Sequence, residues 1–196
     1  MTKLSKFGTA TIHEAIGQRG ALPSRIQALR PGMKLAGRAL PIRSPGGDNL
    51  MLHKAIRSAK PGDVIVADAG FCEEAGPFGD LMTLSAQAAG IAGLVISGAV
   101  RDSEDITAYG FPVFCIGRSI KGTTKSCDGP VPDTIVIGAV RISPGDIIVG
   151  DADGVVVVPG EEEAKAVRLC HEREDKEQQL REKMEAGESL QNLMGL

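Results

Sequence analysis

A short pattern that occurs twice constrains the fold of this chain more than any other feature. Each copy reads Pro-Gly-Asp, then an apolar run rich in β-branched residues, then Asp-Ala; the copies span 61–69 and 144–152. Pro-Gly-Asp is typical of a tight turn, and the apolar run is typical of a buried strand. Two copies are too few for a solenoid, which stacks three or more repeats. The pattern therefore favours a pseudo-duplicated β structure.

The rest of the sequence alternates strand and helix signals in its first half and is mostly β in its second. We expect helices over 11–19, 49–59, 80–90 and 161–186, and strands over 35–42, 64–67, 94–96, 113–116, 134–140, 147–149 and 155–158. These signals predict an α/β fold, a three-layer β/β/α swivelling-type sandwich with a charged C-terminal helix.

The C-terminal helix is expected to stand apart from this sandwich. It is strongly charged, and its thin apolar stripe, which includes Ala166, Cys170 and Met184, indicates packing across a neighbour more than burial in a core. We therefore expect a single β/β/α domain over 1–160 and a helical extension over 161–196 that packs on a neighbouring subunit.

Composition excludes several classes of partner. The formal net charge is −3 and the isoelectric point is near 5.7, so the chain lacks the basic surface that nucleic acid or an anionic membrane would attract. No stretch approaches the 18 or so uninterrupted apolar residues of a membrane helix. We expect no nucleic-acid or membrane partner.

The four cysteines show no paired spacing of the kind that metal sites use, and a chain of 196 residues needs no disulfide framework. We interpret them as thiols and expect a cytoplasmic protein.

The segment from Gly76 to Thr83 is a Gly-rich turn that enters a helix near Asp80 or Leu81. The free N–H groups and the positive dipole at a helix N-terminus bind a carboxylate or phosphate without a basic side chain. Asp80 could instead simply cap the helix. Position in the sequence leaves both readings open.

A second candidate segment follows the strand at 94–96, where small residues lead into Arg101, Asp102 and Asp105. Charges at the carboxyl end of a strand lie where open α/β folds build their sites, and Arg and Asp there can bind a carboxylate and a metal. An internal Arg-Asp ion pair at a helix start is an equal alternative. The earlier Gly-rich loop at 44–49 is either a plain turn or part of a functional rim.

Asp80, Arg101, Asp102 and Asp105 together resemble the D-x20-R-D-x2-E/D signature of the class II 4-hydroxy-4-methyl-2-oxoglutarate/4-carboxy-4-hydroxy-2-oxoadipate aldolases. Relatives of these enzymes include the regulator of ribonuclease activity A proteins. The similarity extends along most of the chain, at 48–50, 61–63, 110–114, 144–146 and 151–159.

The resemblance implies a divalent-metal-dependent aldolase that cleaves 4-hydroxy-4-methyl-2-oxoglutarate, or a similar 4-hydroxy-2-oxo acid, to pyruvate. Oxaloacetate decarboxylation would proceed through the same pyruvate enolate. A single carboxylate ligand suits Mg²⁺, which keeps several waters, and Mn²⁺ is the alternative.

The resemblance also assigns roles. The implied catalytic residues are Asp80, which would orient a water beside the metal, Arg101 and the metal ligand Asp102. The carboxylate of pyruvate or oxaloacetate would be bound by Arg101 and by the turn made of Gly79, Asp80, Leu81 and Met82.

By the same resemblance we expect a homotrimer or a dimer of trimers with sites between subunits. Glu174 or Glu177 of a neighbouring subunit could complete the site, although a solvated helix face explains both residues more simply, so neither is assigned to the site. The segment 115–120 follows the family pattern only loosely, so Arg118 is assigned no more than a capacity to bind an anion, and His13 is interpreted as a surface residue.

The alternative function is a non-catalytic protein inhibitor of a ribonuclease, like the regulator of ribonuclease activity A. Relatives with that role tend to lack the Asp that follows the Arg. Asp102 is present here, which favours the metal enzyme.

Overall fold

The computed structural model describes residues 2–195, so the outermost residues of the expected ranges 1–160 and 161–196 lie outside the described residues. The helices are η1 (Lys3–Lys6), α1 (Thr9–Ala15), α2 (Leu50–Ser58), α3 (Asp80–Ala88), α4 (Ser103–Ala108), η2 (Gly160–Glu162), α5 (Glu163–Glu185) and α6 (Leu190–Met194). The strands are β1 (Gln27–Ala28), β2 (Leu35–Arg43), β3 (Asp63–Cys72), β4 (Gly93–Val100), β5 (Val113–Cys115), β6 (Gly117–Arg118), β7 (Ile135–Ile137), β8 (Val140–Ile142), β9 (Ile147–Asp151) and β10 (Gly154–Val158).

The main sheet has the strand order β1-β5-β4-β3-β2-β9-β10, with β6 pairing beside the end of β4. Strands β2 to β5 are parallel, whereas β1, β9 and β10 run antiparallel to their neighbours. The first half of β2 pairs with β9 and the second half with β3, so β2 belongs to both layers. Strands β7 and β8 form a separate small hairpin.

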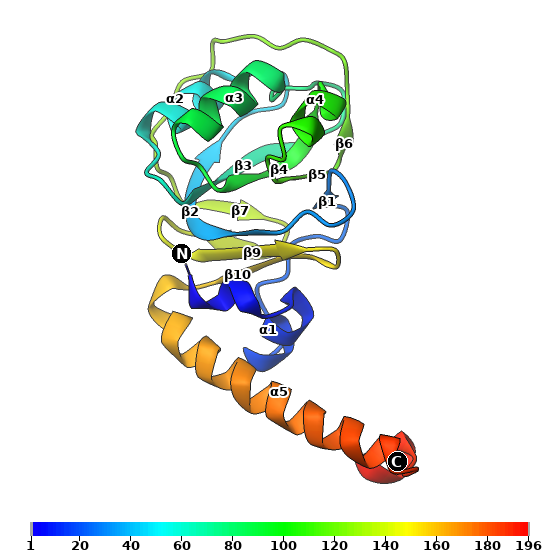
Figure 1. Ribbon diagram of the computed structural model, residues 1–196. Helices are drawn as coiled ribbons and strands as arrows, with labels where there is room; N and C mark the ends of the chain where they lie inside the picture. The colour runs from blue at the N-terminus through cyan, green and yellow to red at the C-terminus, as the bar shows by residue number, and fades with distance from the viewer. Residues whose placement is uncertain (1, 196) are drawn as a thin grey trace.

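The layers confirm the predicted sandwich (Figure 1). Helices α2, α3 and α4 cover one face of the parallel strands, and β9, β10 and β7 lie on the other side. Along β3, Ile65 and Ala67 enter the core under the helices, while Val64 and Val66 enter the core between the β layers. This period of two is what a strand buried on both faces requires.

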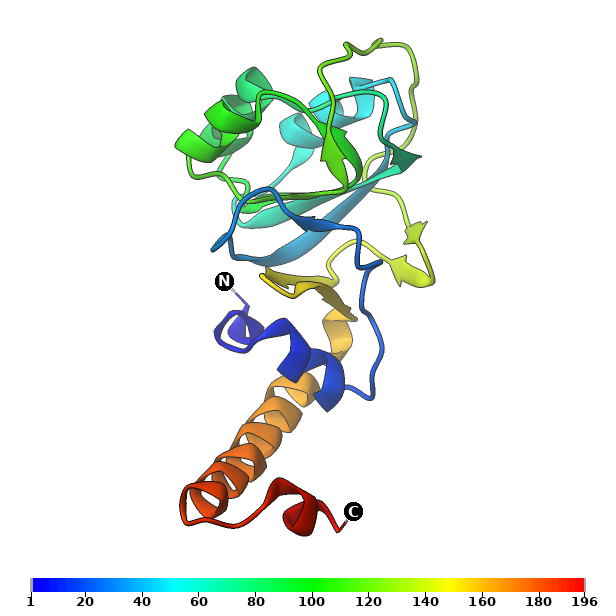
Figure 2. The same ribbon diagram turned by 90° about the vertical axis from the view of Figure 1, so that its right-hand side faces the viewer.

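Helices η1, α1 and the first turns of α5 cover the outer face of β9 and β10. Leu4, Ile12, Val149, Ala166 and Cys170 are buried together there. The expectation that the apolar stripe of α5 avoids the core is therefore wrong for Ala166 and Cys170, because α1 and η1 supply the apolar partners within the same chain. Beyond them α5 extends away from the body, and α6 folds back beside its end (Figure 2). Packing of this outer part on a neighbouring subunit stays a prediction.

Both copies of the repeated pattern form the same turn. Gly62 and Gly145 each adopt a φ of +88°, which favours glycine. Asp63 Oδ2 accepts a hydrogen bond from the Lys60 N–H, and Asp146 Oδ2 accepts one from the Ser143 N–H, each at 2.8 Å. The two strands then flank β2 on opposite sides.

Two of the expected elements need correction. The single strand expected over 134–140 is two strands, β7 and β8, because Gly138 turns the chain with a φ of +62°. The helix expected over 11–19 is α1, which ends at Ala15 because Gly17 and Gln18 have positive φ. Among the described helices, none has both the length and the apolar character needed to cross a membrane.

Candidate active site

The predicted site residues meet at the carboxyl ends of β3 and β4, where α3 and α4 begin. Gly79 precedes α3 and Asp80 is its first residue, while Arg101 and Asp102 follow β4 directly. Because β3 and β4 are parallel neighbours, the N-termini of α3 and α4 lie at the same edge of the sheet.

Asp102 has an unusual backbone conformation. Its φ of 51° and ψ of 42° lie in the left-handed region, which residues other than Gly, Asn and Asp rarely adopt. Although Asp102 precedes α4, its side chain makes no capping bond to that helix. Oδ2 instead accepts a hydrogen bond from the Asp80 N–H at 3.2 Å. The carboxylate is thus directed at the N-terminus of α3.

Arg101 is held by its backbone and leaves most of its guanidinium available. Its N–H donates to Phe78 O at 2.9 Å, and its Nε lies 3.3 Å from Asp102 Oδ2. The side chains of Arg101 and Asp102 are 42% and 33% exposed, so this ion pair contributes little to stability. The ion pair considered as an alternative is present, and it leaves the other donors of Arg101 free to bind an anion.

Two glycines allow this close approach. A Cβ on Gly79 would lie 2.2 Å from Asp102 Oδ2 and 3.0 Å from Arg101 Cγ. A Cβ on Gly76 would lie 2.4 Å from Ser119 O and 2.8 Å from Arg101 Cβ. Any side chain at either position would push Arg101 and Asp102 away from the turn.

Asp80 does not cap α3, because the residue before the helix is Gly79 and no side chain caps it. Within residues 2–195, no hydrogen bond to the Asp80 carboxylate and none from the N–H groups of Leu81 or Met82 is found. Leu81 is 73% exposed and Met82 is buried. The turn therefore offers free donors and a free carboxylate on the same edge.

Sequence reasoning named the loop at 44–49 as a possible rim but gave Asp48 and Asn49 no role; both side chains are buried, and Asn49 contacts this turn. Burial alone would raise the pKa of Asp48, but hydrogen bonds from Ser126, Thr124 and Leu50 outweigh it and hold the pKa well below its usual range. The Asn49 amide reaches Pro77 O at 3.2 Å. Asn49, the last residue of the loop at 44–49, therefore contacts the turn of the candidate site, and the polar pair ahead of an apolar helix is the signal that could have shown it. That this loop forms a functional rim stays a prediction.

A divalent metal would have one direct carboxylate ligand here. Among the described residues no group of three His, Cys, Asp or Glu side chains could hold an ion. Asp102 Oδ1 has no hydrogen-bond partner within residues 2–195, and the Asp80 carboxylate lies on the same edge. That donor set fits Mg²⁺ or Mn²⁺ with most positions filled by water, and it does not fit a closed structural site such as those of zinc.

Of the other candidates, Arg118 lies beside the site, because β6 pairs with β4 at Val100, the residue before Arg101. Arg118 on β6 donates to Leu29 O at 2.8 Å, and His13 Nδ1 lies 2.9 Å from Arg19 O on the surface. Glu174 and Glu177 are on α5, on the far side of the β layers from α3 and α4 (Figure 1). They cannot reach the site of their own chain.

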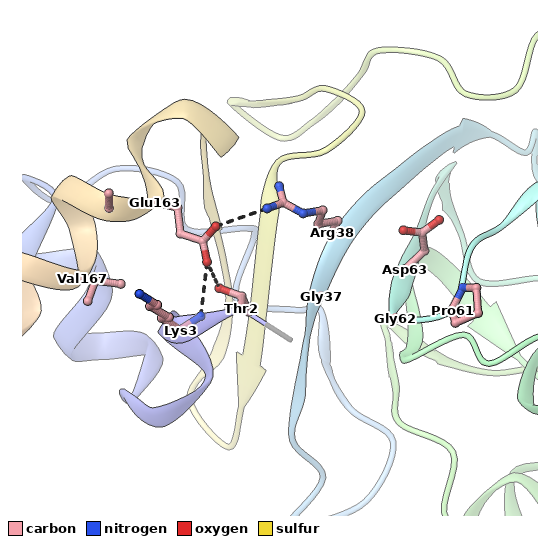
Figure 3. A pocket seen from close by; sticks show the side chains of 10 residues that line it. Thr2, Lys3, Gly37, Arg38, Pro61, Gly62, Asp63, Glu163 and Val167 are labelled. Atoms are coloured by element: carbon pink, nitrogen blue, oxygen red, sulfur yellow. Dashed lines mark hydrogen bonds and ion pairs between the residues drawn. The ribbon is translucent and has the colours of Figure 1, made fainter.

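A cavity of about 550 Å³ lies away from the site. It is bounded by η1, the start of α5, β2 and the turn before β3, and Figure 3 shows Glu163 joined to Thr2, Lys3 and Arg38 on one side of it. Glu163 accepts hydrogen bonds from Thr2 Oγ1 and the Lys3 N–H and lies 3.4 Å from Arg38 Nη2. These contacts join the N-terminal segment to α5 and the sheet, which is a structural role.

Comparison with known proteins shows the family to which the chain is similar. The family model for RraA-like proteins, described as Aldolase/RraA, matches residues 9–157. A protein of Halalkalibacterium halodurans named "Putative 4-hydroxy-4-methyl-2-oxoglutarate aldolase" is 42% identical over 165 residues, covering 83% of this chain and 78% of that protein. An uncharacterized protein of Methanocaldococcus jannaschii is 31% identical over 199 residues, covering 100% and 94% of the two chains.

Solved structures show the same fold. A protein from Pseudomonas syringae pv. tomato has a TM-score of 0.86 at 29% identity, covering 96% of this chain and 89% of that one. The RNA-processing inhibitor RraA from Thermus thermophilis has a TM-score of 0.72 at 25% identity, covering 79% and 93%. The signature residues, the layered fold and these relatives agree, and the chain belongs to the RraA-like family.

Proposed function

We propose that this chain is a divalent-metal-dependent lyase that cleaves 4-hydroxy-4-methyl-2-oxoglutarate, or a similar 4-hydroxy-2-oxo acid, to pyruvate. The same site would decarboxylate oxaloacetate, because both reactions leave a pyruvate enolate. The name of the Halalkalibacterium halodurans relative supports the aldolase activity. The metal dependence is supported by the chemistry of the site.

The observation that carries the proposal is the carboxylate of Asp102. A left-handed backbone costs on the order of 1 kcal/mol or more for a residue with a side chain, and such strain concentrates at functional sites. Here it turns the carboxylate away from the cap position of α4 and toward the N-terminus of α3. A residue needed only to begin α4 would not require this conformation.

Asp102 would hold Mg²⁺ or Mn²⁺, which would supply Lewis acidity for the 2-oxo group while the C3–C4 bond breaks. Arg101 and the free N–H groups of the turn would bind and orient the carboxylate next to that group. In aldol cleavage the C4 hydroxyl loses its proton as the C3–C4 bond breaks, and C3 of the enolate later gains one. We assign Asp80 to orient the water that carries these protons.

The test measures pyruvate release from 4-hydroxy-4-methyl-2-oxoglutarate and from oxaloacetate, with Mg²⁺ and with EDTA. Asp102→Asn is the decisive variant, because Asn tolerates a left-handed backbone and keeps an acceptor for the Asp80 N–H while removing the charge. We expect a fall of about 100-fold or more with either treatment. The matched control is Glu104→Gln, an exposed carboxylate in the first turn of α4, which should keep full activity. Activity that survives both EDTA and Asp102→Asn would refute the proposal.

The alternative function, inhibition of a ribonuclease, is supported by the names of two structural neighbours. They are the Thermus thermophilis inhibitor and Streptomyces coelicolor RraAS2, described as a member of the RNase ES inhibitor family, with a TM-score of 0.80 at 27% identity over 92% of this chain and 95% of that one. An inhibitor needs surface contacts and no metal. Inhibition of RNA cleavage that is equal for wild type and Asp102→Asn, without pyruvate release, would favour this role.

We further propose assembly as a homotrimer or a dimer of trimers, in which residues 161–196 pack on a neighbouring subunit. The side chains of Arg101 and Asp102 are partly exposed, and a neighbouring subunit packed over them would shield the site from water. Glu174 or Glu177 could then approach the metal from that neighbour. Light scattering of the purified chain tests the assembly.

A further inference from the structure

We propose that Asn49 is a positioning residue of this site. Its side-chain amide fixes the Pro77 peptide group of the turn whose N–H groups would receive the substrate carboxylate. The inference rests on the proposed function and adds a residue to it, in a part of the chain that lies outside the signature of Asp80, Arg101 and Asp102.

The side chain of Asn49 contacts both ends of the turn. It lies directly before α2 and is only 6% exposed. Its Nδ2 donates to Pro77 O at 3.2 Å and lies 3.8 Å from Met82 Sδ. One amide group thus links the loop before α3 to the first turn of that helix.

The peptide groups on either side of Pro77 are held by other parts of the chain. The Gly76 N–H donates to Lys121 O at 3.0 Å, and Phe78 O accepts from the Arg101 N–H at 2.9 Å. Within residues 2–195, Asn49 is the partner found for Pro77 O. Without Asn49, no hydrogen bond would hold the peptide group between Pro77 and Phe78, which precedes the free N–H groups of the turn.

Asn49 itself is anchored, so it can impose that orientation. Its backbone N–H donates to Thr124 O at 3.0 Å. The preceding carboxylate, Asp48 Oδ2, accepts from Thr124 Oγ1 and from the Ser126 N–H, each at 2.6 Å. The pair therefore ties the turn of the site to the segment around residue 124.

The side-chain amide of Asn49 directs its N–H group at the turn, and this orientation lowers the stability of the fold. Its Oδ1 is buried without a hydrogen-bond partner among the described residues, and such an acceptor costs on the order of 1–3 kcal/mol. Rotating the amide would give that oxygen no donor, because it would then face the Pro77 carbonyl. A buried polar group that remains unpaired at such a cost in stability is typical of a functional constraint.

The experiment measures binding of oxalate in the presence of Mg²⁺ by calorimetry, because oxalate has the charge and planarity of a pyruvate enolate. Asn49→Leu keeps the approximate shape and removes the donor. We expect oxalate to bind about tenfold more weakly, and the KM for oxaloacetate to rise more than kcat falls. The melting temperature should change little, because one unpaired oxygen on Asn49 is exchanged for another on Pro77.

The matched control is Ser44→Ala, whose hydroxyl is buried nearby and donates to Asp48 O at 3.1 Å without touching the turn. It should lower the melting temperature and leave oxalate binding unchanged. Asp102→Asn should abolish binding.

The outcomes separate the two proposals. If wild type binds oxalate, Asp102→Asn does not, and Asn49→Leu binds as wild type does, the positioning role is wrong and the proposed function stands. The positioning role is also wrong if Asn49→Leu and Ser44→Ala weaken binding and melting temperature in the same proportion, since that indicates a structural role only. If wild type fails to bind oxalate at saturating Mg²⁺, both proposals are wrong.

Discussion

The two copies of the repeated pattern begin alike and end in different surroundings. Strands β3 and β9 start at equivalent Pro-Gly-Asp turns and both pair with β2. At the end of the repeated pattern, Asp68 on β3 accepts a hydrogen bond from Ser97 Oγ on the neighbouring strand β4 at 3.0 Å. Asp151 on β9 instead receives the side chain and backbone N–H of Thr9 at 2.6 and 2.8 Å.

This difference shows which part of each unit is set locally. The conformation of the turn and strand follows from a few adjacent residues. The segment after the strand determines whether the end of the strand contacts the candidate site or a packing helix. After β3 the chain continues to the Gly-rich turn and α3, and after β9 it returns as β10 and anchors α1. Substitutions beyond β3 should therefore reduce activity, and substitutions at the end of β9 should reduce stability.

The largest effect is expected from Gly79→Ala, beyond β3. The new Cβ would overlap Asp102 Oδ2, so the carboxylate and Arg101 must shift, and displacement of about 1 Å typically costs about 100-fold in rate. Pyruvate release checks this. Gly122→Ala is the control, because a Cβ there meets nothing within 4 Å. Full activity in Gly79→Ala would show that the close approach is unimportant.

Asp151→Ala, at the last residue of β9, should lower stability by about 1–2 kcal/mol and leave the rate of pyruvate release unchanged. Burial alone would raise the pKa of Asp151, but bonds from Thr9 and Asp153 outweigh it and lower the pKa. The stabilisation is therefore present above the unfolded pKa near 4 and is lost as pH falls through the lower folded value. Urea unfolding at pH 7 and at pH 3 measures this. An equal difference between variant and wild type at both pH values would contradict it.

The smallest effect concerns the turns that the two copies share. Gly62→Ala and Gly145→Ala each impose a side chain on a φ of +88°, and a Cβ at either position meets nothing within 4 Å. Each should cost about 1 kcal/mol through the backbone alone, and the two losses should agree within about 0.5 kcal/mol. Unequal losses in urea unfolding would show that the turns are not equivalent.

The sequence predicted the fold better than the details of the site. Strands such as 64–67 and 155–158 could be located because their β-branched residues lie between clear turn signals. The division of 134–140 into a hairpin was missed, because Gly138 is a single residue inside an apolar run.

The site residues were identified through a family signature, and their contacts could not be read from adjacent residues. The bond from the Asp80 N–H to Asp102 and the bond from Asn49 to Pro77 join residues on different elements. They depend on which strands are neighbours in the sheet, a property that periodicity does not specify. For the same reason the left-handed backbone of Asp102 was not foreseen.

The central claim is that Asp102 holds a divalent metal at the N-terminus of α3. The most direct measurement is the binding of Mn²⁺, followed by electron paramagnetic resonance of the free ion during titration of wild type, Asp102→Asn and Glu104→Gln. We predict one site per chain in wild type and in Glu104→Gln, and its loss in Asp102→Asn. Equal binding by Asp102→Asn and wild type would contradict the account.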